Sequence, residues 1–171
     1  MRYFTRGWAV GDLTEEESDR ASERYAARLD AIADRLSPPM ARLRSGVSLH
    51  DALIESVRWN PQVAELRLTL VAGTLERGYH TVVLVYRGAL LGVQRIESLR
   101  RAASNREACV LYNEIDVADD GTFVHRILFW PSEETTIDFR ELEYLDTPRG
   151  DCRVHLAGAF VVARVGDGDG G

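Results

Sequence analysis

The sequence predicts an α+β fold, in which an N-terminal amphipathic helix is followed by a curled, mainly antiparallel sheet of half-barrel or sandwich-like shape. Apolar residues recur at helical spacing before residue 37 and at a period near two after residue 47. Short, turn-rich connections join the strand-like segments, which favours antiparallel neighbours. The 171 residues fit one domain, expected over 1–165, followed by a Gly/Asp tail at 166–171 that we expect to be disordered.

The N-terminal helix is expected over about residues 13–36. Asp12 or Thr14 can cap it, and the three glutamates that follow suit the positive end of the helix dipole. Its apolar stripe consists of Ala21, Tyr25, Leu29, Ile32 and Leu36. The helix should end at Ser37, because a residue that precedes proline avoids the α region. A short second helix is expected from Met40 to Ser45.

The sheet should contain about seven strands. They are expected at Ala52–Trp59, Val63–Leu70, Thr81–Tyr86, Val110–Val117, Phe123–Trp130, Thr136–Leu145 and Arg153–Val165. Asp120-Gly121 between two of these segments is a hairpin signal. In Thr136–Leu145 the apolar alternation changes parity, which indicates a bulge near Arg140 and Glu141. Segment 88–106 is ambiguous, with a short helix as one interpretation of 96–106.

Composition narrows the class of protein. All 21 basic residues are arginine, which is typical of a GC-rich bacterial genome and leaves no lysine for Schiff-base or Walker-type chemistry. No stretch has the length and hydropathy of a membrane span, and the first residues lack the apolar run of a signal peptide. The two cysteines are too few for a disulfide framework. We therefore expect a cytoplasmic protein without membrane contact.

Charge is distributed unevenly along the chain. The formal net charge is −6, and segment 107–151 alone carries twelve acidic residues against three arginines. This balance disfavours nucleic-acid binding, which needs a dominant basic face. The candidate face for a basic protein partner consists of Glu114, Asp116, Asp119, Asp120, Glu141 and Glu143. We expect these side chains to be mostly exposed, and any that points inward to pair with Arg126 or Arg140.

The histidines offer a second kind of site. His50, His80 and His125 are candidate polar groups of an apolar pocket beneath the N-terminal helix. They lack the spacing of metal ligands, so we expect no stoichiometric metal and no other cofactor. No Gly-x-Ser-x-Gly or phosphate-loop motif is present, and both cysteines lie in apolar contexts typical of inert side chains.

Three short segments resemble an uncharacterised bacterial family, a domain of unknown function whose members begin Met-Lys/Arg-Tyr-Phe-Thr. They are Met1–Thr5, Ser48–Ala52, and the pair Leu111–Ile115 and His125–Leu128 joined through Asp120-Gly121. The second segment resembles a Phe-His-Asp motif of the family, with Leu49 in place of the aromatic residue. The resemblance implies a compact α+β fold related to bacterial toxin-immunity proteins, and it implies no activity and no catalytic residues.

Three interpretations of function remain. The favoured one is a non-enzymatic binding or regulatory protein, immunity-like in role, that docks a basic partner through the acidic residues of 107–151. The alternative is a small-molecule-binding protein or enzyme with a pocket beneath the N-terminal helix. In the third, the acidic residues are only solvated and the protein forms a homodimer through its sheet.

Overall fold

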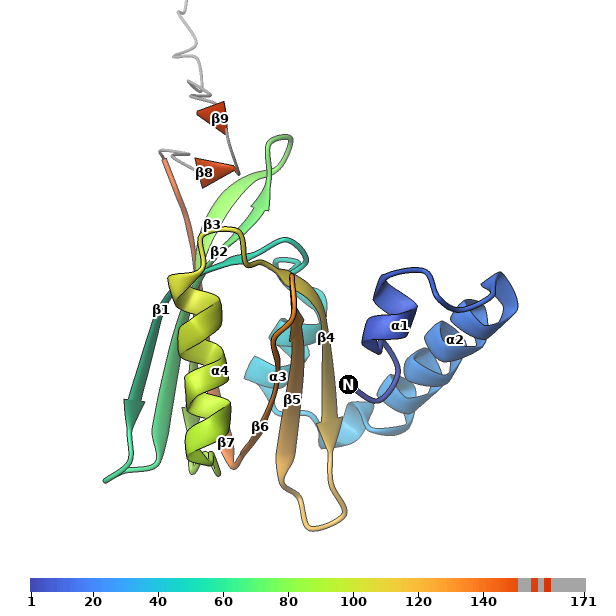
Figure 1. The fold of residues 1–171 in the computed structure, drawn as a ribbon. Coiled ribbons are helices and arrows are strands. Elements are labelled where there is room, and N and C mark those ends of the chain that lie inside the picture. Colours follow the sequence, from blue (N-terminus) through green and yellow to red (C-terminus); the bar gives the residue numbers. More distant parts are fainter. Residues whose placement is uncertain (151–154, 157–158, 161–171) are drawn as a thin grey trace, which may run out of the picture.

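The computed structural model describes residues 1–150, 155–156 and 159–160. The helices are α1 (Arg6–Ala9), α2 (Glu15–Ala31), the 3₁₀ turn η1 (Ala33–Arg35), α3 (Pro38–Ser45) and α4 (Val93–Ser104). The strands are β1 (Leu53–Asn60), β2 (Glu65–Thr74), β3 (Gly78–Arg87), β4 (Val110–Val117), β5 (Phe123–Phe129), β6 (Glu134–Phe139), β7 (Glu141–Pro148), β8 (His155–Leu156) and β9 (Ala159–Phe160). The predicted α+β class with antiparallel strands is confirmed (Figure 1).

The main strands form two sheets, so the prediction of one curled sheet is wrong. Strands β1, β2, β3 and β7 make a four-stranded sheet, and β4, β5 and β6 make a three-stranded sheet. The chain passes from one sheet to the other at Arg140, between Phe139 of β6 and Glu141 of β7. The change in parity that predicts a bulge arises because Phe139 faces the core from one sheet and Leu142 faces it from the other.

A shared core lies between the two sheets and beneath α3 and α4. Inward-facing side chains of both sheets belong to one apolar cluster, which includes Leu68, Leu84, Phe129, Ile137 and Phe139. Helix α4 packs against β1 and β6, and α3 packs against β7. Figure 1 shows α4 and the three-stranded sheet on the same side of the four-stranded sheet.

Helix α2 begins as predicted and packs differently. The Thr14 hydroxyl accepts the Glu17 N–H at 3.3 Å while the Glu17 carboxylate accepts the Thr14 N–H at 2.9 Å, which is a capping box. The expectation that an amphipathic N-terminal helix covers the sheet holds only in part, because no residue of α2 is buried. The reason is position: α2 lies beside β4 rather than across a sheet (Figure 1), and only a narrow side, including Tyr25 and Leu29, is half-buried.

The β4–β5 hairpin is confirmed. Its tip is closed by the Gly121 N–H, which donates to the Ala118 carbonyl, and Gly121 adopts a φ of 81°, which a residue without Cβ tolerates. The Asp120 carboxylate accepts both the N–H and the hydroxyl of Thr122 at 2.9 Å. The turn residues therefore have the structural role that their sequence predicts.

Two expectations fall largely outside the described residues. Of the predicted strand Arg153–Val165, only β8 and β9 are described, and they pair with each other. The tail at 166–171 lies wholly outside. No described helix combines the length and the apolar character needed to cross a membrane.

Candidate functional site

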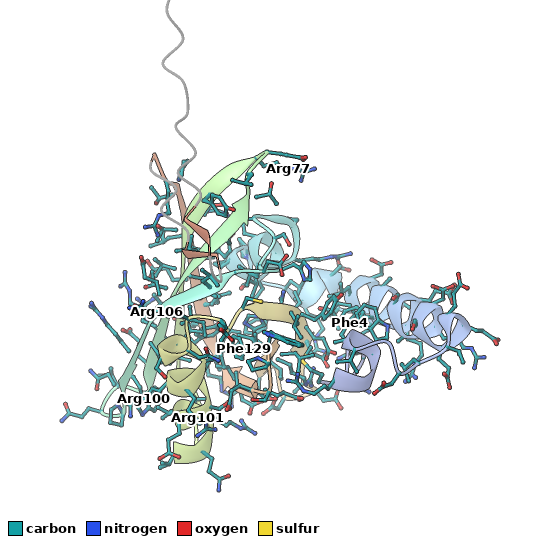
Figure 2. The ribbon with its side chains drawn as sticks, turned by 45° about the horizontal axis from the view of Figure 1, so that its top comes forward. Phe4, Arg77, Arg100, Arg101, Arg106 and Phe129 are labelled. Atoms are coloured by element: carbon teal, nitrogen blue, oxygen red, sulfur yellow. The ribbon has the colours of Figure 1, made fainter. Side chains whose placement is uncertain are left out.

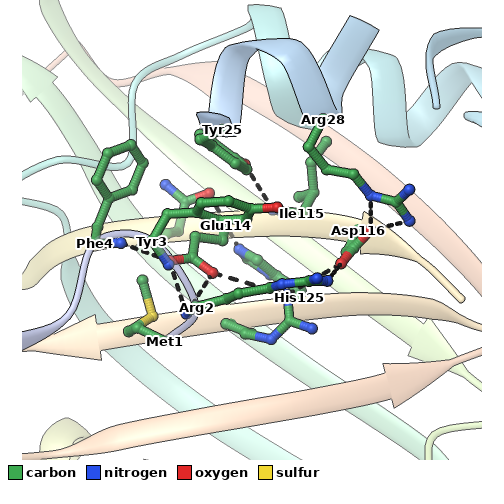
Figure 3. Close-up of polar contacts among 12 residues, drawn as sticks. Met1, Arg2, Tyr3, Phe4, Tyr25, Arg28, Glu114, Ile115, Asp116 and His125 are labelled. Atoms are coloured by element: carbon green, nitrogen blue, oxygen red, sulfur yellow. Dashed lines mark hydrogen bonds and ion pairs between the residues drawn. The ribbon is translucent and has the colours of Figure 1, made fainter. Parts of the chain in front are cut away.

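The first residues of the chain are bound by one buried carboxylate. Glu114 on β4 has a fully buried side chain and accepts the backbone N–H groups of Arg2, Tyr3 and Phe4, at 2.9, 2.7 and 2.8 Å (Figure 3). Hydrogen bonds from N–H groups to an ionised carboxylate are stronger than neutral ones. Glu114 therefore anchors the N-terminal segment on the face of the three-stranded sheet.

A charge cluster surrounds this anchor. Arg126 lies opposite Glu114 on β5, and its Nη1 is 3.8 Å from the Glu114 carboxylate and 3.5 Å from that of Asp116. Arg28 of α2 binds Asp116 at 2.7 Å, and Arg2 lies 3.5 Å from the same carboxylate. Burial raises the pKa of Asp116, and Arg28, the Val117 N–H and Arg126 outweigh it, so the pKa lies below its ordinary value.

The expected exposure is therefore wrong for Glu114 and Asp116. Both alternate along β4 with core residues such as Ile115, and the face on which they lie is covered by the N-terminal segment and α2. Removing two carboxylates from water requires compensating charges. The prediction that an inward carboxylate would pair with Arg126 is confirmed.

The other four residues of the expected acidic face differ in exposure. Asp119 and Asp120 are exposed at the β4–β5 tip, and Glu141 is exposed on β7. Glu143 is half-buried and binds Arg87 at 2.9 Å. Arg140, at the corner between the sheets, lies 3.8 Å from Asp120 and links the hairpin tip to the beginning of β7.

A chain of buried polar groups crosses the core from β3 to β4. The Tyr86 hydroxyl lies 2.8 Å from His125 Nδ1, and His125 Nε2 lies 3.3 Å from Asn113 Oδ1. Burial lowers the pKa of His125 to about 3, so the ring is neutral and has one donor and one acceptor. We assign the Tyr86 hydroxyl as donor to Nδ1. If Nδ1 carried the proton instead, the buried hydroxyl hydrogen of Tyr86 would have no acceptor. His125 then donates to Asn113 Oδ1.

A cavity of about 250 Å³ lies where this chain ends, between α2, α3, the segment after α3 and the edge of β4. Its apolar wall consists of Leu29, Leu43, Val47, Leu49 and Ile115. Its polar side chains include Tyr25, Arg44 and Asn113. The volume is just below the ~300–1,000 Å³ of most ligand sites, which suits a small molecule.

Three polar side chains of this cavity, those of Tyr25, Asn113 and Arg44, can donate hydrogen bonds into it. The Tyr25 hydroxyl accepts the Ile115 N–H at 2.8 Å, and burial raises its pKa to about 12, so it keeps a proton to donate. The Asn113 oxygen is occupied by His125, which leaves its NH₂ group. Arg44 uses one nitrogen to bind Asp30 at 3.0 Å and has other N–H groups.

The three candidate histidines do not converge on the cavity. His125 reaches it only through Asn113, and His80 on β3 lies opposite Pro148. His50 is exposed beside the cavity, where Nδ1 bonds the Leu111 carbonyl and the ring packs 5.3 Å from that of Tyr112. Tyr25 and Leu29 of α2 line the cavity, whereas none of the three histidines expected there is among its lining residues. Tyr25, Arg44 and Asn113 carry no sequence motif, because they come from three separate elements.

The segments of the family resemblance meet at one place in the structure. Tyr3 and Phe4 bind Glu114 through their N–H groups, while His50 and Phe4 both pack against the ring of Tyr112. Figure 2 shows Phe4 near α1 and α2. The N-terminal segment, the His-Asp segment and β4 thus form one contact region beside the cavity.

Comparison with known proteins and the search for metal clusters gave negative results. A scan against protein-family models, a search of curated proteins and a search of solved structures each found no match. Among the described residues, no group of three or more His, Cys, Asp or Glu side chains is placed to hold a metal ion.

Proposed function

We propose that this chain is a non-enzymatic binding protein that holds a small carboxylate- or carbonyl-containing molecule in the cavity between α2, α3 and β4. The supporting observation is that donor side chains of Tyr25, Arg44 and Asn113 line the same cavity as an apolar wall that includes Leu29, Leu43 and Ile115. Ligand sites of this kind fix a polar head with a few hydrogen bonds and bury an apolar body.

Binding rather than catalysis fits the state of the nearby reactive groups. His125 is neutral and separated from the cavity by Asn113. Burial, with the charge of Asp51, raises the pKa of Cys109, which keeps the thiol protonated and weakly nucleophilic.

The test is an NMR titration of the full chain with acetate, isobutyrate and benzoate, with isobutanol as an uncharged control. Saturable shifts of the Asn113 side-chain amide are expected with at least one carboxylate and not with isobutanol. Tyr25→Phe should weaken binding by about ten- to a hundredfold, because a hydrogen bond to a charged group contributes about 1.5–3 kcal/mol. Tyr79→Phe, a half-buried tyrosine on β3, is the matched control. No saturation with any carboxylate, or equal affinity in both variants, contradicts the proposal.

The second candidate function is binding of a basic protein partner. The site would be the end of the molecule that contains the β4–β5 tip and the β6–β7 corner. The observation that favours it is the exposure of Asp119, Asp120 and Glu141 at sites linked through Arg140. A hexa-arginine peptide should bind the wild type weakly and lose affinity with added salt. The variant carrying Asp119→Arg and Glu141→Arg should not bind it, and equal binding by this variant contradicts the idea.

Family membership and a cytoplasmic location also remain proposals. The contact between Arg2–Phe4 and Glu114 supports the first, since two segments of the resemblance bind each other directly. A family alignment in which the N-terminal motif and this glutamate occur together would test it.

A further inference from the structure

The four-stranded sheet has one face that no described helix or strand covers. This outer face is the side turned away from α4 and the three-stranded sheet (Figure 1). From β1 to β7, its four rows are Asn60, Glu65, Arg87 and Glu141; Arg58, Arg67, Val85 and Glu143; Ser56, Thr69, Val83 and Leu145; and Leu53, Val71, Thr81 and Thr147. The residues that alternate with them, such as Leu66, Leu68 and Leu84, are buried in the core.

The charged side chains of the outer face lie in two of its rows, and Arg87 on β3 pairs with Glu65 on β2 and Glu143 on β7 within the subunit. Arg58 and Arg67 are exposed near the β1 edge, and within the described residues neither forms an ion pair. Glu141 and Glu143 lie at the β7 edge. The other two rows mix apolar and hydroxyl side chains: Leu145 is 46% exposed, Val71 and Val83 are half-buried, and Thr81 lies 3.5 Å from Arg149, which pairs with Glu55.

We propose that the outer face is a homodimer interface in which two copies pack face to face about a twofold axis parallel to the strands. Such an axis places the β1 edge of one copy over the β7 edge of the other and keeps each row on itself. Arg58 then lies opposite Glu143 of the partner subunit. In the next row, Glu65 lies opposite Arg87 of the partner subunit, and each contact occurs twice.

The charges select this axis over the other in-plane choice. A twofold axis perpendicular to the strands would reverse the order of the rows. It would place the row containing Glu65 and Arg87 over the row containing Val71 and Thr81. The charges beside that row, Glu55 and Arg149, already pair with each other, so Glu65 and Arg87 would be desolvated without new partners. The parallel axis instead sets charged rows on charged rows. It places Val83 over Thr69 of the partner subunit and Leu145 over Ser56 of the partner subunit.

The size of the face predicts a weak dimer. Four strands spaced about 4.8 Å apart and eight residues at about 3.4 Å each give a footprint of roughly 500 Å² per subunit. The total of about 1,000 Å² is at the lower limit for a specific interface. Association should therefore appear at micromolar or higher concentration and weaken with salt.

A charge-swap experiment with the full-length chain tests the interface. Sedimentation of the wild type from about 1 to 500 μM should show reversible dimerisation. Arg58→Glu and Glu143→Arg should each raise the dimer Kd about tenfold or more, because each creates two repulsive contacts in a symmetric dimer. An equimolar mixture of these two variants should restore dimers, since every 58–143 contact in the heterodimer joins opposite charges. Misfolding of a variant cannot produce this rescue.

Arg100→Glu is the matched control, because Arg100 is exposed on α4, on the other side of the sheet (Figure 2). It should leave the Kd within about twofold of the wild type. The proposal is overturned if the wild type stays monomeric at 500 μM, if Arg58→Glu dimerises like the wild type, or if the variant mixture stays monomeric under conditions in which the wild type dimerises.

Discussion

Replacing Glu114 tests whether one buried carboxylate holds the N-terminal segment in place. Glu114→Ala removes the acceptor of three backbone N–H groups and leaves Arg126 with Asp116 as its remaining partner. Breaking a buried charge pair by removing one partner costs about 3–5 kcal/mol. The Tyr3 N–H lies in a buried site, where water does not readily replace the lost bond.

The assay is urea unfolding of the full chain, together with amide hydrogen exchange at Tyr3 and Phe4. For a chain of this length, a loss of about 3–5 kcal/mol corresponds to a fall in Tm of roughly 6–20 °C. Glu114→Gln, which keeps the shape and one acceptor oxygen, should lose about half as much and still expose both amides to exchange.

Glu141→Ala serves as the control. Glu141 is exposed, so its replacement should lower the free energy of unfolding by less than about 0.5 kcal/mol. A loss below about 1 kcal/mol for Glu114→Ala, or protected amides at Tyr3 and Phe4 in that variant, would refute the anchoring role.

Three further predictions concern pH, charge reversal and metals. Burial lowers the pKa of His125 from 6.5 to about 3 in the folded state, so the unfolded chain binds one more proton between these values. The stabilising contribution of neutral His125 should be fully present above pH 6.5. Below that pH the free energy of unfolding should fall by about 1.4 kcal/mol per pH unit, and a flat profile in urea unfolding from pH 6.5 to 5 would contradict this. Joint Asp119→Arg and Glu141→Arg substitution should change the unfolding free energy by less than about 1 kcal/mol. Asp116→Arg, which sets a fourth arginine beside Arg2, Arg28 and Arg126, should cost several kcal/mol. Thermal melts that rank the variants the other way would be inconsistent with the charge cluster. Elemental analysis of purified protein should find no stoichiometric zinc or iron, and about one metal per chain that is lost in His50→Ala would show otherwise.

Local signals predicted the elements well wherever a few adjacent residues decide the outcome. Thr14 and Glu17 form the capping box that their spacing predicts, and Asp120-Gly121 closes the predicted hairpin. Segment 96–106 becomes most of α4, although its beginning at Val93 was not predicted. These features depend on backbone geometry within one turn, so the sequence contains the necessary information.

The parity change near Arg140 shows the limit of such signals. The alternation of apolar residues correctly locates a break between Phe139 and Leu142. A bulge within one sheet and a passage between two sheets produce the same pattern in the sequence. Only the pairing of β6 with β5 and of β7 with β3 distinguishes them.

By itself, the sequence determined the class of fold, the strand order along the chain and the acidic character of segment 107–151. The tertiary structure alone decided that Glu114 is buried while Asp119 is exposed, although both belong to that segment. It also brought Tyr25, Arg44 and Asn113 to one cavity. The physical reason is that a carboxylate becomes an internal anchor or a solvated charge according to what packs on its strand face, and for Glu114 those residues lie more than a hundred positions away in the chain.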